Sequence, residues 1–477
     1  MPGTHASGTR SRAAKTTAAT AQRRVSAFAL SGVDGWRGIA AVAVILAHVW
    51  TNMDMNGDGM GPGTSLPWVM WIMQNLDIVI DMFFVLSAIL IWLPFGAAML
   101  SDKAPLPHGG VFFIRRVTRF LPLYWVVVVF QWSLHNYNVA KADWIDLIEH
   151  LTLTQSLDSK RIFYTVGPAW TMSVEWFFYL SMAFIAPFFV RWIRRNARTP
   201  GGRLGLFVLG TAPILLASLA FKAYVAAANI PVTDWAWRFG PAAKADIFII
   251  GMWTGTLIVI LRGRKLPVFM LPALLAVAVW SYAQVMVPPT VDHNLHHEII
   301  RHTVASLAFC LMLFGLSTSR WQLPARMIDN KVMMPLSLMA YSIYILHEGI
   351  MGWAEKHGLF SYAQNGNAYA YNAVMVLALA LPISWFFHRA IEMPWANVSW
   401  LVNSNGTKRE LYPHLLATSA PHDARLLASY ISHAKRRAGQ HFGPSSNVTV
   451  LAQRFDTGPA SPAPMTGTAP TPVGGVG

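Results

Sequence analysis

Residues 69–95 read VMWIMQNLDIVIDMFFVLSAILIWLPF, and this stretch decides the class of fold. Its only charged residues are Asp77 and Asp81, and the remainder is almost wholly apolar. A helix that crosses a bilayer needs about 20 mostly apolar residues. The stretch is long enough to meet that need, so we expect it to form a transmembrane helix.

Nine further apolar runs of this kind follow one another along the chain. They cover approximately residues 37–53, 119–135, 169–190, 204–225, 245–261, 266–287, 302–318, 334–353 and 371–390. The sequence therefore predicts an all-α, polytopic membrane protein with about ten transmembrane helices, with the lipid bilayer as its main partner.

The composition agrees with a membrane protein and excludes several other classes. Of 477 residues, 54% are hydrophobic and only 12% are charged, whereas soluble domains carry about 25% charged residues. Disordered chains, fibrous chains and typical soluble enzymes are thereby excluded. The net charge of +15 does not indicate nucleic-acid binding, because the basic residues lie between apolar runs. The single cysteine, Cys310, excludes an internal disulfide and a cysteine-based metal cluster.

The distribution of basic residues predicts the orientation. When the segments between runs are assigned alternately to the two sides, 29 of the 37 Lys and Arg residues fall on the side of the N-terminus. Cytoplasmic loops carry such an excess of Lys and Arg. We therefore expect both termini to be cytoplasmic and the protein to be a multi-pass component of the cell's inner (plasma) membrane.

The two ends differ in composition from the apolar centre. Residues 1–30 are rich in Ala, Thr, Ser and Arg, and we interpret them as a disordered basic tail, with a transit peptide as the alternative. Residues 31–398 form the membrane domain. Residues 399–477 are expected to be a mostly disordered cytoplasmic tail, in which 424–439 has helical spacing. That segment is either an amphipathic membrane-surface helix or a solvated one.

Ionisable residues inside the predicted spans are the strongest functional signal, because a charge in mid-bilayer is expensive unless it is paired or hydrated. Counting along the helices at 1.5 Å per residue places three of them, His48, Glu175 and His347, at similar depths in the outer half of the membrane. A shared polar chamber would explain this coincidence, although His347 is equally compatible with a purely structural role. The full set is Arg37, His48, Asp77, Asp81, Glu175, Asp246, His347 and Glu348.

Four histidines near the predicted outer loop, His293, His296, His297 and His302, have the composition of a metal site. They lack a fixed spacing of ligands, so we expect no metal there.

Six blocks of sequence resemble, in order, the acyltransferase-3 family of integral membrane acyltransferases. The first, VDGWRGIAA at 33–41, is followed by His48 at an R-x10-H spacing from Arg37. The second, VIDMFFVLS at 79–87, departs mildly from the family, because the usual Ser-Gly is Ser87-Ala88 here. The others are RRVTR at 115–119 followed by Pro122 and Tyr124-Trp125, WTMSVEWFFY at 170–179, YSIYILH at 341–347 and HRAIEMPW at 388–395. The resemblance covers about residues 30–398.

The resemblance implies transfer of an acyl group from acyl-CoA, a donor co-substrate, with no tightly bound cofactor. Histidine suits the abstraction of a hydroxyl proton because it titrates near neutral pH, and we assign the general base to His48. Arginine suits phosphate binding, so Arg115, Arg116 and Arg119 are candidates to hold the donor, with an ordinary positive-inside anchor as the alternative. We expect Arg37 to orient the donor. Glu175 is expected either to orient or charge-balance His48 or to help to bind the acceptor. The substrate chamber is expected to include Asp81, Trp170 and His347.

Richness in Ala and Arg indicates a high-GC bacterium. The acceptor is therefore expected to be a hydroxylated glycan or glycolipid of the bacterial envelope, or another hydroxylated small molecule. The main alternative is a secondary transporter or a lipid-linked sugar flippase, in which the buried charges would form a proton relay. The sequence shows neither the internal repeats nor the paired broken helices that are frequent in transporters. A structural scaffold would leave the charges within the spans unexplained.

Overall fold

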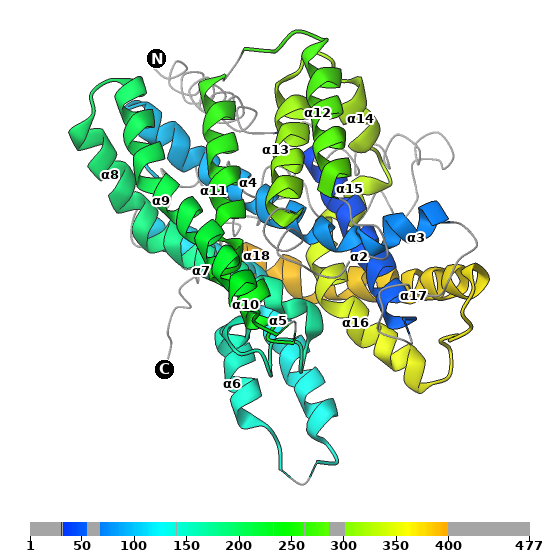
Figure 1. Ribbon diagram of the computed structural model, residues 1–477. Helices are drawn as coiled ribbons and strands as arrows, with labels where there is room; N and C mark the ends of the chain where they lie inside the picture. Colours follow the sequence, from blue (N-terminus) through cyan, green and yellow to red (C-terminus); the bar gives the residue numbers. More distant parts are fainter. Residues whose placement is uncertain are drawn as a thin grey trace, which may run out of the picture. The chain divides into compact units, whose positions relative to one another are not determined.

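Each of the ten apolar runs corresponds to one helix or to two consecutive helices in the computed structural model (Figure 1). The run 69–95, expected to be one helix, is interrupted between Gln74 and Val79. The structure describes residues 30, 32–54, 67–139, 141–231, 233–261, 264–285 and 301–398. These residues form helices and turns, and their only β-pairing is an isolated bridge between Leu266 and Ser319. The expectation of an all-α protein is confirmed. The predicted terminal tails, the 424–439 helix and His293, His296 and His297 lie outside the described residues.

Seven stretches of the described chain are long and apolar enough to cross a membrane. Some consist of consecutive helices, such as α3 with α4 and α7 with α8. The helices that build these stretches are α2 (Val33–Asn52), α3 (Pro67–Gln74), α4 (Val79–Leu100), α5 (Gly109–Asn136), α7 (Trp170–Leu180), α8 (Ala186–Asn196), α9 (Pro200–Ala227), α10 (Ala236–Phe239), α11 (Pro241–Ile260), α17 (Gly366–Phe387) and α18 (Met393–Val398).

The other three runs form shorter helices, α12 (Met270–Val285), α13 (His302–Thr318) and α16 (Ala340–Lys356). A helix of 17 residues, the length of α13 and of α16, is about 26 Å long, slightly less than the hydrocarbon thickness of a bilayer. The count of ten spans thus stays a prediction. The remaining short helices are α6 (Trp144–Thr152), α14 (Leu323–Ile328) and α15 (Met333–Leu338).

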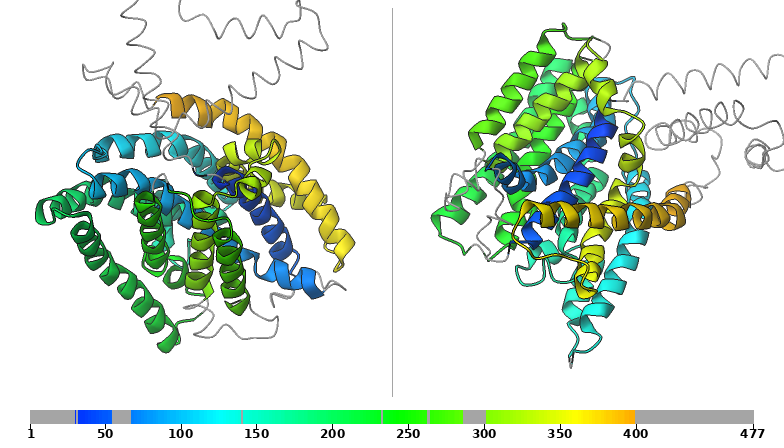
Figure 2. Two further views of the ribbon diagram at one scale, coloured as in Figure 1. Left: turned by 90° about the horizontal axis from the view of Figure 1, so that it is seen from above. Right: turned by 90° about the vertical axis from the view of Figure 1, so that its right-hand side faces the viewer.

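Helix α4 contributes most to the apolar core, because it contacts α2, α11 and α13 (Figure 2). Its Trp92 is fully buried and stacks on Phe207 of α9, with ring centroids 5.0 Å apart. The approach of α11 is close enough that a Cβ atom added at Gly251 would lie 2.5 Å from the Cβ of Ala88. A glycine is therefore required where these two helices cross.

Helix α9 exposes most of its length and is held at both ends by ion pairs. At its beginning Arg203 lies 2.9 Å from Asp102 in the preceding loop, and near its end Lys222 lies 2.7 Å from Asp246 of α11. The hydrogen bond from Arg203 holds the pKa of Asp102 below its usual range, because it stabilises the charged carboxylate. These ion pairs add to the stacking of Phe207 on Trp92 in fixing the position of α9 against its neighbours.

Two π-helical turns, Ser181–Ile185 and His388–Glu392, contact helix α5, which carries the predicted donor-binding arginines. The first turn lies so close to α5 that a Cβ atom at Gly109 would be 1.8 Å from the carbonyl oxygen of Ala183. Glycine at this position is what lets α5 begin against the turn. Single π-turns inside α-helices are frequent near functional sites.

Candidate active site

Two histidines from helices far apart in the sequence form the centre of the candidate site. His48 is on α2 and His347 is on α16, and Nδ1 of the former lies 2.8 Å from Nε2 of the latter. His347 is fully buried, whereas His48 keeps part of its surface exposed. Of the three residues expected at a common depth, the structure therefore brings these two into direct contact.

The hydrogen bonds around the pair define which ring nitrogens carry protons. Nδ1 of His347 lies 2.7 Å from the carbonyl oxygen of Tyr344 and 3.2 Å from that of Ile343. A carbonyl can only accept, so Nδ1 of His347 is the donor and its Nε2 is left as an acceptor in the neutral ring. Nδ1 of His48 must then donate to that Nε2, which leaves Nε2 of His48 with a free lone pair. The geometry thus favours His48 as a proton acceptor.

The segment of α16 that carries His347 is fixed against the beginning of α7. The hydroxyl of Tyr344 donates to the carbonyl oxygen of Pro168 at 3.0 Å and accepts from Thr171 at 2.9 Å. The Glu348 carboxylate lies over Gly167, where an added Cβ atom would be 2.4 Å from Oε2. These contacts hold the backbone carbonyls that orient His347.

Glu175 belongs to a second polar cluster and not to the histidine pair. Ser87 donates to its Oε1 at 2.6 Å, and the hydroxyl of Tyr179 donates to its Oε2. Arg116 and Arg37 are both near enough to act electrostatically on this carboxylate. We call these five residues the arginine–glutamate cluster.

The two polar groups are separated along α2. Arg37 and His48 are eleven positions apart, which corresponds to about 16 Å along the helix axis. Arg116 of α5 stands over the Tyr179 ring, 5.5 Å from its centroid, and 5.6 Å from that of Phe112. Arg115 and Arg119 lie on the same helix within one turn. The cationic residues therefore lie near one end of α2 and the histidine pair about three helical turns farther along it.

Asp81 and Trp170, both expected near the substrate, meet at a third cluster. Asp81 is fully buried, 2.6 Å from Nδ1 of His302 and 3.6 Å from Nζ of Lys244. Lys244 stands 6.0 Å from the centroid of the Trp170 ring and 5.5 Å from that of Phe239. These ionic contacts connect helices α4, α11 and α13.

Sequence reasoning missed several of these partners. The sequence assigns no role to Lys244, nor to Tyr179 and Ser87, which both lie in the blocks that resemble the family. The available signal was that a buried acid such as Asp81 requires a compensating group. His302, one of the four histidines considered for a metal, instead faces that carboxylate.

Comparison with protein families identifies the chain. The acyltransferase-3 model, described as an acyltransferase domain, matches residues 30–389. The chain belongs to this family. The acyltransferase-3 match includes both histidines, the arginine–glutamate cluster and every helix from α2 to α17. No curated protein and no solved structure gave a match. Family membership and the apolar helices together indicate a multi-pass membrane acyltransferase.

Proposed function

We propose that the protein transfers an acetyl or other short acyl group from cytoplasmic acyl-CoA to a hydroxyl group of an envelope glycan or glycolipid. The observation that carries this proposal is the contact between His48 and His347 inside an acyltransferase-3 domain. It supplies an oriented base for a hydroxyl proton, as the transfer of an acyl group from a thioester to an alcohol requires.

In the proposed mechanism, Nε2 of His48 takes the proton of the acceptor hydroxyl while the hydroxyl oxygen attacks the thioester carbonyl carbon. The new ester forms as the carbon–sulfur bond breaks, and the leaving thiolate receives the proton from His48. His347 accepts a hydrogen bond from Nδ1 of His48 throughout and stabilises the imidazolium. The transfer needs no acyl-enzyme.

Arginines on the path toward the cytoplasm are proposed to receive the donor. Arg115, Arg116 and Arg119 would hold the CoA phosphates, since guanidinium groups bind phosphate oxygens in a bidentate manner. Arg37, near Glu175, would orient the pantetheine arm toward His48. The distance of about 16 Å along α2 suits an extended arm reaching from the arginines to the base.

Exchange of Arg119 for lysine tests the proposed donor site. Lysine keeps the charge but loses the bidentate geometry, so we expect Arg119→Lys to raise the KM for acyl-CoA several-fold and leave the KM for the acceptor nearly unchanged. Steady-state kinetics of the purified protein measures both constants. Wild-type values for both, with normal turnover, would reduce Arg119 to a topological anchor.

The proposed topology has ten spans and both termini in the cytoplasm of the plasma membrane. It predicts that Lys160, an exposed residue between α6 and α7, is outside the cell. In a Cys310→Ser background, Lys160→Cys should react with a membrane-impermeant thiol reagent in intact cells. If labelling requires permeabilisation, the orientation is reversed.

The reaction itself is tested by mass spectrometry of envelope fractions from a strain that lacks the gene. We expect one acyl mass to disappear from a glycan or glycolipid, and to return with the wild-type gene but not with His48→Asn. An unchanged acyl profile together with altered solute flux would instead favour a transporter.

A further inference from the structure

Helix α6 has an unusual distribution of polar and apolar residues for a segment between spans. It begins at the cap Asp143, whose side chain accepts from the backbone N–H of Asp146 at 3.1 Å. Asp146 and His150 are fully buried, whereas Trp144, Ile145 and Ile148 are 61%, 55% and 59% exposed. The helix therefore turns its polar side into the protein and its apolar side outward, the reverse of a water-facing helix.

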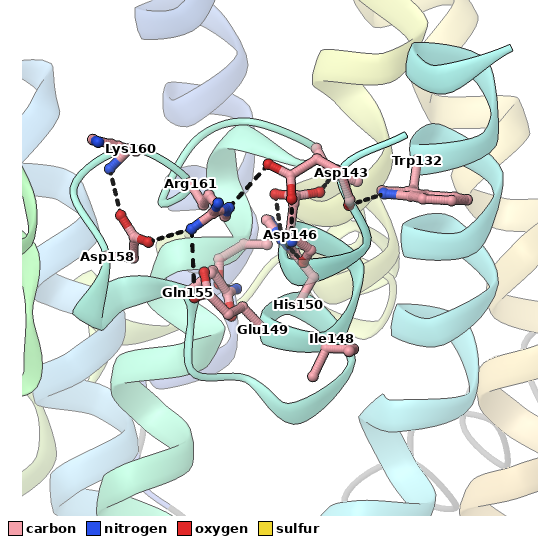
Figure 3. Close-up of polar contacts among 12 residues, drawn as sticks. Trp132, Asp143, Asp146, Ile148, Glu149, His150, Gln155, Asp158, Lys160 and Arg161 are labelled. Carbon is pink, nitrogen blue, oxygen red and sulfur yellow. Dashed lines mark hydrogen bonds and ion pairs between the residues drawn. The ribbon is translucent and has the colours of Figure 1, made fainter. Parts of the chain in front are cut away.

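The buried polar side of α6 is held by a network of side chains (Figure 3). Nδ1 of His150 lies 3.1 Å from Oδ1 of Asp146, and Thr165 donates to the other oxygen of the same carboxylate. Beside it, Arg161 contacts Asp143 at 3.0 Å. These contacts pair the Asp143 and Asp146 carboxylates with side chains of the protein itself, as charged groups at membrane depth require.

Three hydrogen bonds show that α6 runs back along the second half of α5. The hydroxyl of Tyr124 donates to the carbonyl of His150, the indole of Trp125 to that of Leu151, and the indole of Trp132 to that of Asp143. The later residues of α6 thus meet the earlier ones of α5. From Tyr124 to Trp132 the contacts extend over eight helical steps of α5, or about 12 Å. After leaving α5, the chain therefore returns toward the opposite end of that helix.

The same length of α5 also packs against α16, which carries His347. The hydroxyl of Tyr341 donates to the carbonyl of Phe120 at 2.7 Å, and Gly349 lies against the Gln131 amide. His347 is between these two contacts along α16. Helix α6 is therefore level with the histidine pair, on a helix that is long and apolar enough to span a membrane.

We propose that α6 is a re-entrant helix embedded in the outer leaflet, with Trp144, Ile145 and Ile148 against lipid chains. The occupant follows from continuity with the exposed face of α5. Trp132 and Trp144 bring their rings to 4.7 Å, and the neighbouring exposed residues of α5 are Trp125, Val126, Val129, Phe130 and Leu134. No basic residue interrupts the α6 side of this surface. If water instead of lipid covered this joint face of α5 and α6, a contiguous apolar patch would be exposed to solvent.

An environment-sensitive fluorophore on a single cysteine tests this inference independently of the reaction. The full chain, with Cys310→Ser and Ile148→Cys, is labelled and reconstituted into phosphatidylcholine vesicles. We expect the emission to be blue-shifted relative to that of the Lys160 probe. A nitroxide on the upper acyl chain should quench the Ile148 probe strongly, and iodide should quench it several-fold more weakly than it quenches the Lys160 probe. Val129→Cys on α5 is the matched lipid-facing control, and Lys160→Cys is the matched aqueous control.

Two results would overturn the proposal. Iodide quenching of the Ile148 probe equal to that of the Lys160 probe would place α6 in water. Protection from both quenchers, with cross-linked dimers through the Ile148→Cys thiol, would make a second copy of the chain the occupant. If Ile148→Cys does not yield monodisperse protein, Ile145→Cys reports on the same face. The outcome holds whether or not the protein transfers acyl groups.

Discussion

Purified His48→Asn is expected to lose at least about 10²-fold in acyl transfer when donor and acceptor are both saturating, because a general base contributes about 10²–10⁴-fold. Asparagine keeps the polarity and most of the volume of the side chain but cannot take up a proton near neutral pH. The measurement is the rate of product formation by mass spectrometry or by release of free CoA thiol.

The comparison requires evidence that the variant is folded, such as the same elution volume and melting temperature as the wild type in detergent. Turnover within about tenfold of the wild type would contradict a base role for His48, since loss of the base should cost more. The assignment would then pass to Glu175 or His347, whose variants belong in the same assay.

Removal of the partner imidazole is expected to have the second largest effect. In His347→Leu the acceptor for Nδ1 of His48 is lost, so the ring of His48 is no longer held in one tautomer and orientation. We expect kcat to fall by about 10–10²-fold, less than on loss of the base itself, with little change in either KM.

A conservative exchange separates this positioning role from simple packing. In His347→Gln the side-chain oxygen can still accept a hydrogen bond, so part of the lost kcat should return. If His347→Leu has wild-type kcat, or if Gln and Leu are equally impaired, His347 does not act through its acceptor nitrogen.

Much of the fold was predictable because each membrane helix needs its own apolar run. The structure forms a helix in all ten predicted places, and its boundaries at α2, α9 and α13 lie within about five residues of the expected ones. The segment containing α6 was less accessible to this reasoning. Its three acids, at positions 143, 146 and 149, resemble those of a water-exposed loop, and only the burial of Asp146 and His150 shows that its polar side faces inward.

The candidate site was predictable as a set of residues but not as a set of contacts. Helical rise placed His48 and His347 at similar depths, and the structure adds that they touch. The same calculation placed Glu175 beside them, whereas its hydrogen-bond partners are Ser87 and Tyr179. The expected depth was wrong for Glu175, because Pro168, just before α7, lies beside Tyr344, close to the histidine pair. Glu175 lies seven residues, or about 10 Å, farther along, near Arg37.

The ion pair between Lys222 and Asp246 has a consequence for biogenesis. Each of these charges would be unfavourable in lipid by itself, but together they form a neutral, hydrogen-bonded unit with Thr303 of α13. Helices α9 and α11 are therefore expected to leave the insertion machinery as a hairpin rather than one at a time. Helix α13, made later by the ribosome, would then close the unit from the other side.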